Sequence, residues 1–168
     1  MSPPTRQAEA GLAALLTYAG TLPFIACAAL AWLDAPARIA GLAPADITLA
    51  HITLADIAVA YGAVIASFIA GTHWAARVYR PEVSALPTLV LSNAFALLAW
   101  LALLLPQRAW GLVLLIACFA GLLAVDAGLR RGGMLPGWFW PLRRNATLIV
   151  CAMLALTAYA TAAQAQGA

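Results

Sequence analysis

Five long stretches without a charged side chain dominate this sequence of 168 residues. They run between Glu9 and Asp34, Asp56 and Arg77, Glu82 and Arg108, Arg108 and Asp126, and from Asn145 to the C-terminus. Each supplies the roughly 17–25 apolar residues that a membrane-spanning helix requires. We therefore predict one all-α membrane domain over residues 1–168, a polytopic bundle of five transmembrane helices. The expected helices lie at about 11–33, 54–77, 86–105, 109–129 and 144–163.

Charged residues make up only 9% of the chain, against about 25% in soluble proteins. The basic residues are all arginines, and they gather at the ends of the apolar stretches without forming a basic run. This pattern is typical of membrane topology signals and not of a nucleic-acid footprint. We expect the lipid bilayer as a partner and no nucleic acid.

The arginines also predict the direction of the spans. Five spans place the two termini on opposite sides of the membrane, and two arginines, Arg38 and Arg108, share the side of the C-terminus. The other side carries Arg6, Arg77, Arg80, Arg130, Arg131, Arg143 and Arg144. Because cytoplasmic loops are rich in arginine, we expect a cytoplasmic N-terminus and a C-terminus outside.

Two connections carry further signals. The longest, at about 34–53, contains prolines and glycine, for which we expect a short interfacial helix or turn on the outer face. The inner connection at about 134–141 is rich in proline and tryptophan and flanked by Arg130, Arg131, Arg143 and Arg144, so we expect these arginines at the lipid headgroups. Within the first span, Thr21 and Pro23 indicate a kink with local hydrogen-bond repair.

Small residues recur at every fourth position along two stripes of the second span. The stripes are Ala58, Gly62, Ala66 and Ala70, and Ala63, Ser67, Gly71 and Ala75. Small side chains let helix backbones approach closely in lipid. We expect this span to be central, with Gly62, Ala66, Ser67 and Gly71 as helix-packing residues.

The same span contains His73-Trp74 and, one turn later, Arg77, inside otherwise apolar sequence. Polar groups are costly at membrane depth and persist where a neighbour or a function compensates them. One interpretation is structural: Asp126 pairs with Arg130, Arg77 reaches the headgroups, and His73 bonds a neighbouring helix. The other is functional: a site in the inner leaflet for a polar ligand head, or a proton-sensitive switch. Its candidate residues are His73, Trp74, Arg77, Asn93 and Asp126.

No catalytic or cofactor motif is present, and we predict no catalytic residues, no metal and no cofactor. A metal site is not expected at Asp46, His51 and Asp56, because side chains at steps of five residues do not share a helix face. We interpret this segment as a solvated loop. The cysteines, Cys27, Cys118 and Cys151, lie in apolar runs as small buried side chains.

These observations leave three functions open. The first is a non-enzymatic interaction or accessory protein of a larger membrane complex. The second is a membrane-embedded binding protein or carrier for a lipid-soluble small molecule such as a quinone, a lipid or a tetrapyrrole. The third is a membrane enzyme, for which one histidine and one aspartate supply little chemistry.

Several stretches resemble a bacterial inner-membrane family of unknown function that includes the animal mitochondrial transmembrane protein 69. They are residues 18–24 (Tyr-Ala-Gly-Thr-Leu-Pro-Phe), 61–74 with its Ser-Phe-x-x-Gly-x-His-Trp core, 135–139 (Leu-Pro-Gly-Trp-Phe) and Leu142-Arg143. The resemblance implies a five-helix, multi-pass protein of the bacterial inner membrane with no established activity. For the accessory-protein hypothesis, the mitochondrial relative implies that the larger complex could be a respiratory one. The size and tryptophan content are also similar to those of the tryptophan-rich sensory proteins, which bind porphyrins and sterols.

Overall fold

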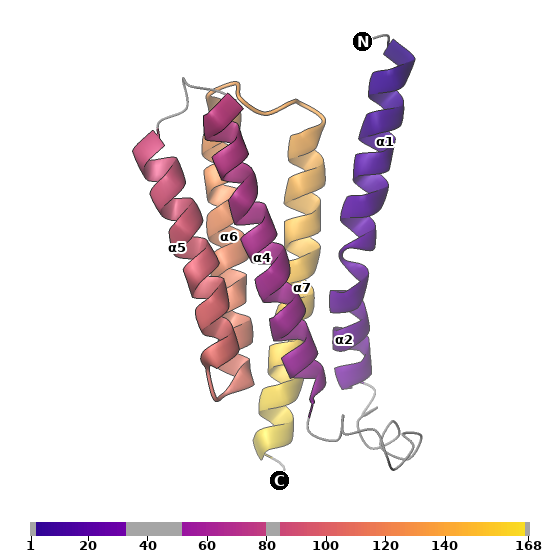
Figure 1. Cartoon of the computed structure of the whole chain (residues 1–168). Helices are drawn as coiled ribbons and strands as arrows, with labels where there is room; N and C mark the ends of the chain where they lie inside the picture. Colours follow the sequence, from indigo (N-terminus) through magenta and orange to yellow (C-terminus); the bar gives the residue numbers. More distant parts are fainter. Residues whose placement is uncertain (1–2, 33–51, 80–84, 167–168) are drawn as a thin grey trace.

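A computed structural model describes residues 3–32, 52–79 and 85–166, and within them every regular element is a helix. The helices are α1 (Pro3–Ala19), α2 (Leu22–Trp32), α4 (Leu54–Tyr79), α5 (Ala85–Leu104), α6 (Arg108–Arg131) and α7 (Phe139–Gln166). They form an up-and-down bundle with α5 at one edge and α1 with α2 at the other (Figure 1). The chain ends lie at opposite ends of the bundle, and the predicted helical fold is confirmed. The interfacial helix or turn that we predicted between the first two spans, with Asp46 and His51, lies outside the described residues.

Among the described residues, four segments are long and apolar enough to cross a membrane, and α5 supplies a shorter fifth. The four are Ala8–Trp32, Leu54–Tyr79, Arg108–Arg131 and Phe139–Ala163; the shorter one is Thr88–Leu104. Large apolar side chains such as Phe68, Leu97 and Trp100 are exposed on the outside of the bundle. Such a surface suits lipid as the surrounding solvent, so the chain is a multi-pass membrane protein.

The first span is broken at Gly20 and Thr21, between α1 and α2. Pro23 has no backbone N–H and its ring cannot pack against the preceding helical turn, so the helix cannot run straight through. Side chains support the backbone at the break. The Tyr18 carbonyl accepts from both the Thr21 N–H at 3.0 Å and the Thr21 hydroxyl at 2.7 Å, and the Gly20 carbonyl accepts from the Tyr61 hydroxyl at 3.0 Å. Below the break α2 packs against α4 and α7, whereas α1 packs mainly against α7.

Helix α4 is the packing centre, in contact with α2, α5, α6 and α7. The first small-residue stripe is buried throughout, at Ala58, Gly62, Ala66 and Ala70. A methyl group at Gly62 would meet the end of the Leu115 side chain at 2.8 Å, so the glycine lets Leu115 of α6 pack directly on the α4 backbone. On the second stripe Ala63 is buried, whereas Ser67 and Gly71 are exposed, because this stripe turns away from the buried face of α4 along the helix.

At the end of the bundle that holds the C-terminus, Thr53 and Asp56 begin α4 with reciprocal hydrogen bonds. The Thr53 backbone and hydroxyl donate to the Asp56 carboxylate at 2.8 and 2.7 Å, and the Asp56 N–H donates to the Thr53 hydroxyl at 3.1 Å. Arg108 forms an ion pair with Asp56 and donates to the Leu103 and Leu105 carbonyls at the end of α5. Asp56 therefore has a structural role, joining the start of α4 to the turn between α5 and α6.

Candidate functional site

A buried carboxylate on α6 links three helices near the end of the bundle that holds the N-terminus. Asp126 is 3% exposed; its Oδ1 lies 2.9 Å from Nε2 of His73 on α4, and its Oδ2 accepts a hydrogen bond from Nε of Arg143 on α7 at 2.8 Å. His73 is 1% exposed. We call these three side chains the ionic network. Because it satisfies both carboxylate oxygens, the network can hold a charge inside the bundle.

The start of α7 explains why Arg143 faces inward. The helix begins at Phe139, five residues earlier than the predicted 144, with Pro141 in the first turn, where a missing N–H costs nothing. Arg143 consequently lies within the helix and not in the connecting loop, where we had expected it at the headgroups. Thr147 is one turn further along the same helix face. Arg144, the next residue in the helix, donates instead to the side-chain oxygen of Asn145.

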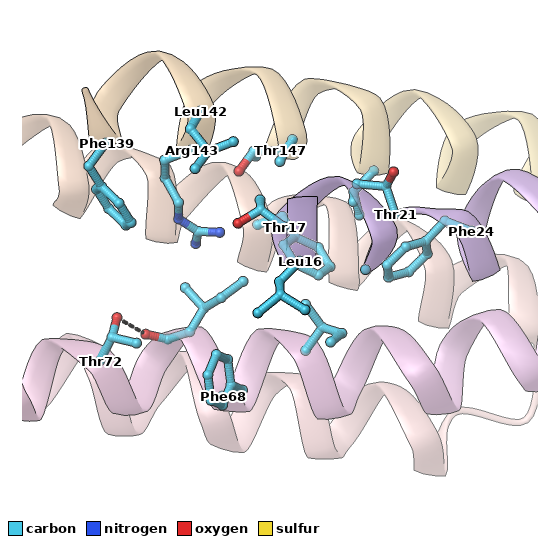
Figure 2. A pocket seen from close by; sticks show the side chains of 16 residues that line it. Leu16, Thr17, Thr21, Phe24, Phe68, Thr72, Phe139, Leu142, Arg143 and Thr147 are labelled. Carbon is cyan, nitrogen blue, oxygen red and sulfur yellow. Dashed lines mark hydrogen bonds between the residues drawn. The ribbon is translucent and has the colours of Figure 1, made fainter. Parts of the chain in front are cut away.

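A cavity of about 290 Å³ lies beside the ionic network, between α1, α2, α4, α6 and α7. Figure 2 shows Arg143 and Thr147 directed toward the space between α7 and α4, with Thr17 and Leu16 of α1 next to them. Most of the wall is apolar. Its residues are Leu16, Thr17, Gly20, Thr21, Phe24, Ile65, Phe68, Ile69, Thr72, Phe119, Phe139, Leu142, Arg143, Ala146, Thr147 and Val150.

Two polar atoms on this wall are buried without a hydrogen-bond partner, Nη2 of Arg143 and Oγ1 of Thr147. The hydroxyls of Thr21 and Thr72 also line the cavity, but each already donates to a carbonyl of its own helical segment, Thr72 to Ile69 at 2.7 Å (Figure 2). Buried polar atoms without partners are rare in folded proteins. The cavity therefore has an apolar body and one polar end, where two side chains can each make a further hydrogen bond.

The cavity opens toward the lipid between α1 and α4. Leu16 of α1 and Phe68 of α4 both line it, yet they are 63% and 72% exposed. The opening exists because the break after Ala19 leaves α1 packed mainly against α7 while α2 closes against α4. A molecule dissolved in the bilayer can therefore reach the cavity sideways.

The structure brings together two of the five candidate residues, His73 and Asp126. Trp74 follows His73 on the exposed side of α4 and is 46% exposed. Asn93 is exposed and donates to the Leu89 carbonyl of its own helix, because its neighbour Ser92 occupies the face toward α4, donating to the Ala70 carbonyl at 2.6 Å. None of the five candidates lines the cavity; His73 and Asp126 lie behind it and reach it through Arg143.

Arg77 is half-buried on α4, one turn beyond His73 toward the end of the bundle that holds the N-terminus. Arg130, the expected partner of Asp126, lies instead over the Trp140 ring, 5.0 Å from its centroid. The arginine at the end of α6 and the tryptophan at the start of α7 thus contact each other across the loop that joins the two helices.

Arg143 and Thr147 were not among the predicted site residues. Their spacing of four was the available signal, since it places a cation and a hydroxyl on one face of an apolar helix. The described residues contain no group of three or more histidine, cysteine or acidic side chains arranged to hold a metal ion.

Fold and site together define a helical, multi-pass membrane protein with a buried ionic network beside a lipid-facing cavity. The chain belongs to the family described as "Protein of unknown function (DUF3429)", whose model matches residues 10–159. No curated protein and no solved structure matches the chain.

Proposed function

We propose that this protein binds a lipid-soluble small molecule, with the polar head of the ligand against Arg143 and Thr147 and its tail along the apolar wall. The observation that carries the proposal is the pair of buried, unpartnered polar atoms at one end of an otherwise apolar cavity. A buried donor without a partner costs about 1–3 kcal/mol. A head that accepts from both side chains recovers that cost, and the match of apolar body to polar end is typical of ligand sites.

The size of the cavity favours a slim ligand. Its volume of about 290 Å³ is at the lower end of the roughly 300–1,000 Å³ range of small-molecule sites. An acyl or isoprenoid chain with a compact head, as in a lipid or a quinone, suits this space better than a tetrapyrrole macrocycle. A longer tail would continue into the bilayer through the opening between Leu16 and Phe68.

The proposal includes a place for the protein: the bacterial inner membrane, with the N-terminus in the cytoplasm and the C-terminus outside. The arginine-rich end of the bundle supports this orientation, which puts the head of the ligand in the inner leaflet. We also propose that the chain is related to the mitochondrial transmembrane protein 69, which would then have a similar site in a mitochondrial membrane.

The test compares two threonines of α7. Thr147 lines the cavity, whereas the equally buried Thr157 donates to the Met153 carbonyl and lies away from it. We expect small molecules extracted from the purified protein to be depleted in Thr147→Leu, which fills the cavity, and retained in Thr157→Leu at equal folded yield. If the wild type carries no extractable amphiphile and quinones, fatty acids and lysolipids all leave its melting temperature unchanged, the proposal fails.

A second function is supported by the exposed part of α4. Ser67, Gly71 and Ala75 form a strip of small residues with no helix packed on it among the described residues. Such strips mediate close helix contacts in lipid, so this face favours an accessory protein of a larger membrane complex. The expected result is a partner recovered in mild detergent with the wild type and lost with Gly71→Leu. Recovery of the same proteins with the wild type and with Gly71→Leu would exclude this role for the strip.

A further inference from the structure

The charge of the ionic network restricts which ligand head the cavity can accept. Arg143 brings one positive charge and Asp126 one negative charge, and they are in direct contact at 2.8 Å. With a neutral His73, whose Nε2–H then donates to Asp126, the network is balanced. An uncharged head at Arg143 leaves this balance intact, whereas an anionic head adds an unbalanced negative charge in a low-dielectric interior.

A second proton on His73 can supply the positive charge that balances an anionic head. In the neutral form its Nε2 carries the proton that is donated to Asp126, and Nδ1 is buried without a hydrogen-bond partner. A second proton would bind at Nδ1 and give the network two cations and one anion. Asp126 would then be shared by two cations, and the net positive charge would be available to a ligand at Nη2 of Arg143.

We propose, building on the proposed function, that the cavity takes up a single-chain amphiphile with an anionic head together with one proton, which is held by His73. Uptake of the anion and the proton leaves the site electrically neutral. The small volume and the single polar end argue for one chain, since a two-chain phospholipid would have to leave most of its apolar body outside.

Other groups near His73 do not compete for this role. On its own helix Arg77 keeps its positive charge. On α6 Arg130 is a cation placed over Trp140, and Asp126 is paired on both oxygens. Helix α5 carries no ionisable side chain between Ala85 and Leu104, and α2 carries only the Cys27 thiol. On α7 Arg143 is a cation paired with Asp126. The proton that enters with the anion is therefore assigned to Nδ1 of His73.

The experiment uses the full chain in phosphatidylcholine nanodiscs with two probes of equal chain length. Dodecyl sulfonate stays ionised across the pH range, and dodecanol stays neutral. We expect the affinity for dodecyl sulfonate, corrected for empty nanodiscs, to rise by up to tenfold per pH unit as the pH falls, because each bound anion takes up one proton. The affinity for dodecanol should not change with pH.

Nuclear magnetic resonance of ¹⁵N-histidine reads the proton directly. The chain has two histidines, so His51→Gln leaves His73 as the sole signal. At a fixed pH, dodecyl sulfonate should increase the protonated fraction of His73, and dodecanol should not. The His73→Gln variant should lose the pH dependence; if it does not fold, the signal of the native histidine still decides the question.

The outcomes separate the two proposals. Binding of dodecanol with pH-independent binding of dodecyl sulfonate would overturn the proton-linked inference and leave the proposed function standing. Failure of both probes to bind would overturn both. Displacement of dodecyl sulfonate by phosphatidylglycerol in the nanodisc would show that a two-chain lipid supplies the anion, and would contradict the single-chain ligand.

Discussion

Replacing Thr147 by valine tests whether the buried hydroxyl forms its hydrogen bond only with a bound ligand. The substitution keeps the shape of the side chain and removes one polar atom, which is buried and lacks a partner in the ligand-free protein. Such an atom costs about 1–3 kcal/mol, so Thr147→Val should raise the free energy of unfolding of the ligand-free protein by about 1 kcal/mol. The same change removes one hydrogen bond to the ligand and should weaken binding about fivefold.

Thr157→Val is the matched control on the same helix. Its hydroxyl is equally buried but donates to the Met153 carbonyl at 2.9 Å, so valine there should leave ligand binding unchanged and lower stability slightly. Titration with guanidinium chloride in phosphatidylcholine nanodiscs, with and without ligand, measures both quantities. If ligand-free Thr147→Val is destabilised as much as Thr157→Val, the Thr147 hydroxyl has a partner in the folded protein and the reasoning fails.

Four further substitutions address the network and the packing. Asp126→Ala should lower the free energy of unfolding by about 3–5 kcal/mol, measured by the same titration, because it leaves Arg143 buried without its counter-charge; a loss below about 1 kcal/mol would show that the network is solvated. Gly121→Ala should destabilise the protein by about 1–3 kcal/mol, because the added methyl group would collide with the Phe95 ring. Gly128→Ala is the control, since the space around Gly128 is open and alanine there should be neutral or stabilising. Equal melting temperatures of the two variants would refute the close contact between α5 and α6. Arg108→Gln should cost up to about 1 kcal/mol, since its half-exposed ion pair with Asp56 and its bonds to two carbonyls at the end of α5 are lost; no change in melting temperature would mean that these contacts are solvent-screened.

The helical bundle was predictable because membrane thickness dictates the length of each apolar stretch. Glu9, Asp34, Asp56 and the arginines mark the ends of these stretches in the sequence itself. The break near Thr21 was predictable for a similarly local reason, since Pro23 removes a hydrogen bond wherever it stands. These features depend on single residues and their neighbours in sequence.

The site was predictable only in part, because it depends on which helix faces which. The cost of burying charge drew attention to His73 and Asp126, which contact each other. Asn93 was the predicted residue on α5, but the step of about 100° between neighbouring helix residues means that Ser92 meets α4 and Asn93 does not. Arg143 was assigned to the headgroups because the positive-inside rule reads it as a loop residue, whereas the early start of α7 places it beside Asp126.

A density map of the protein purified in lipid nanodiscs tests the central proposal most directly. We predict elongated density in the cavity between α1, α4 and α7, with its polar head within about 2.7–3.2 Å of Arg143 Nη2 and Thr147 Oγ1. A cavity closed by the Leu16 and Phe68 side chains, or density whose head lies away from Arg143, would contradict it.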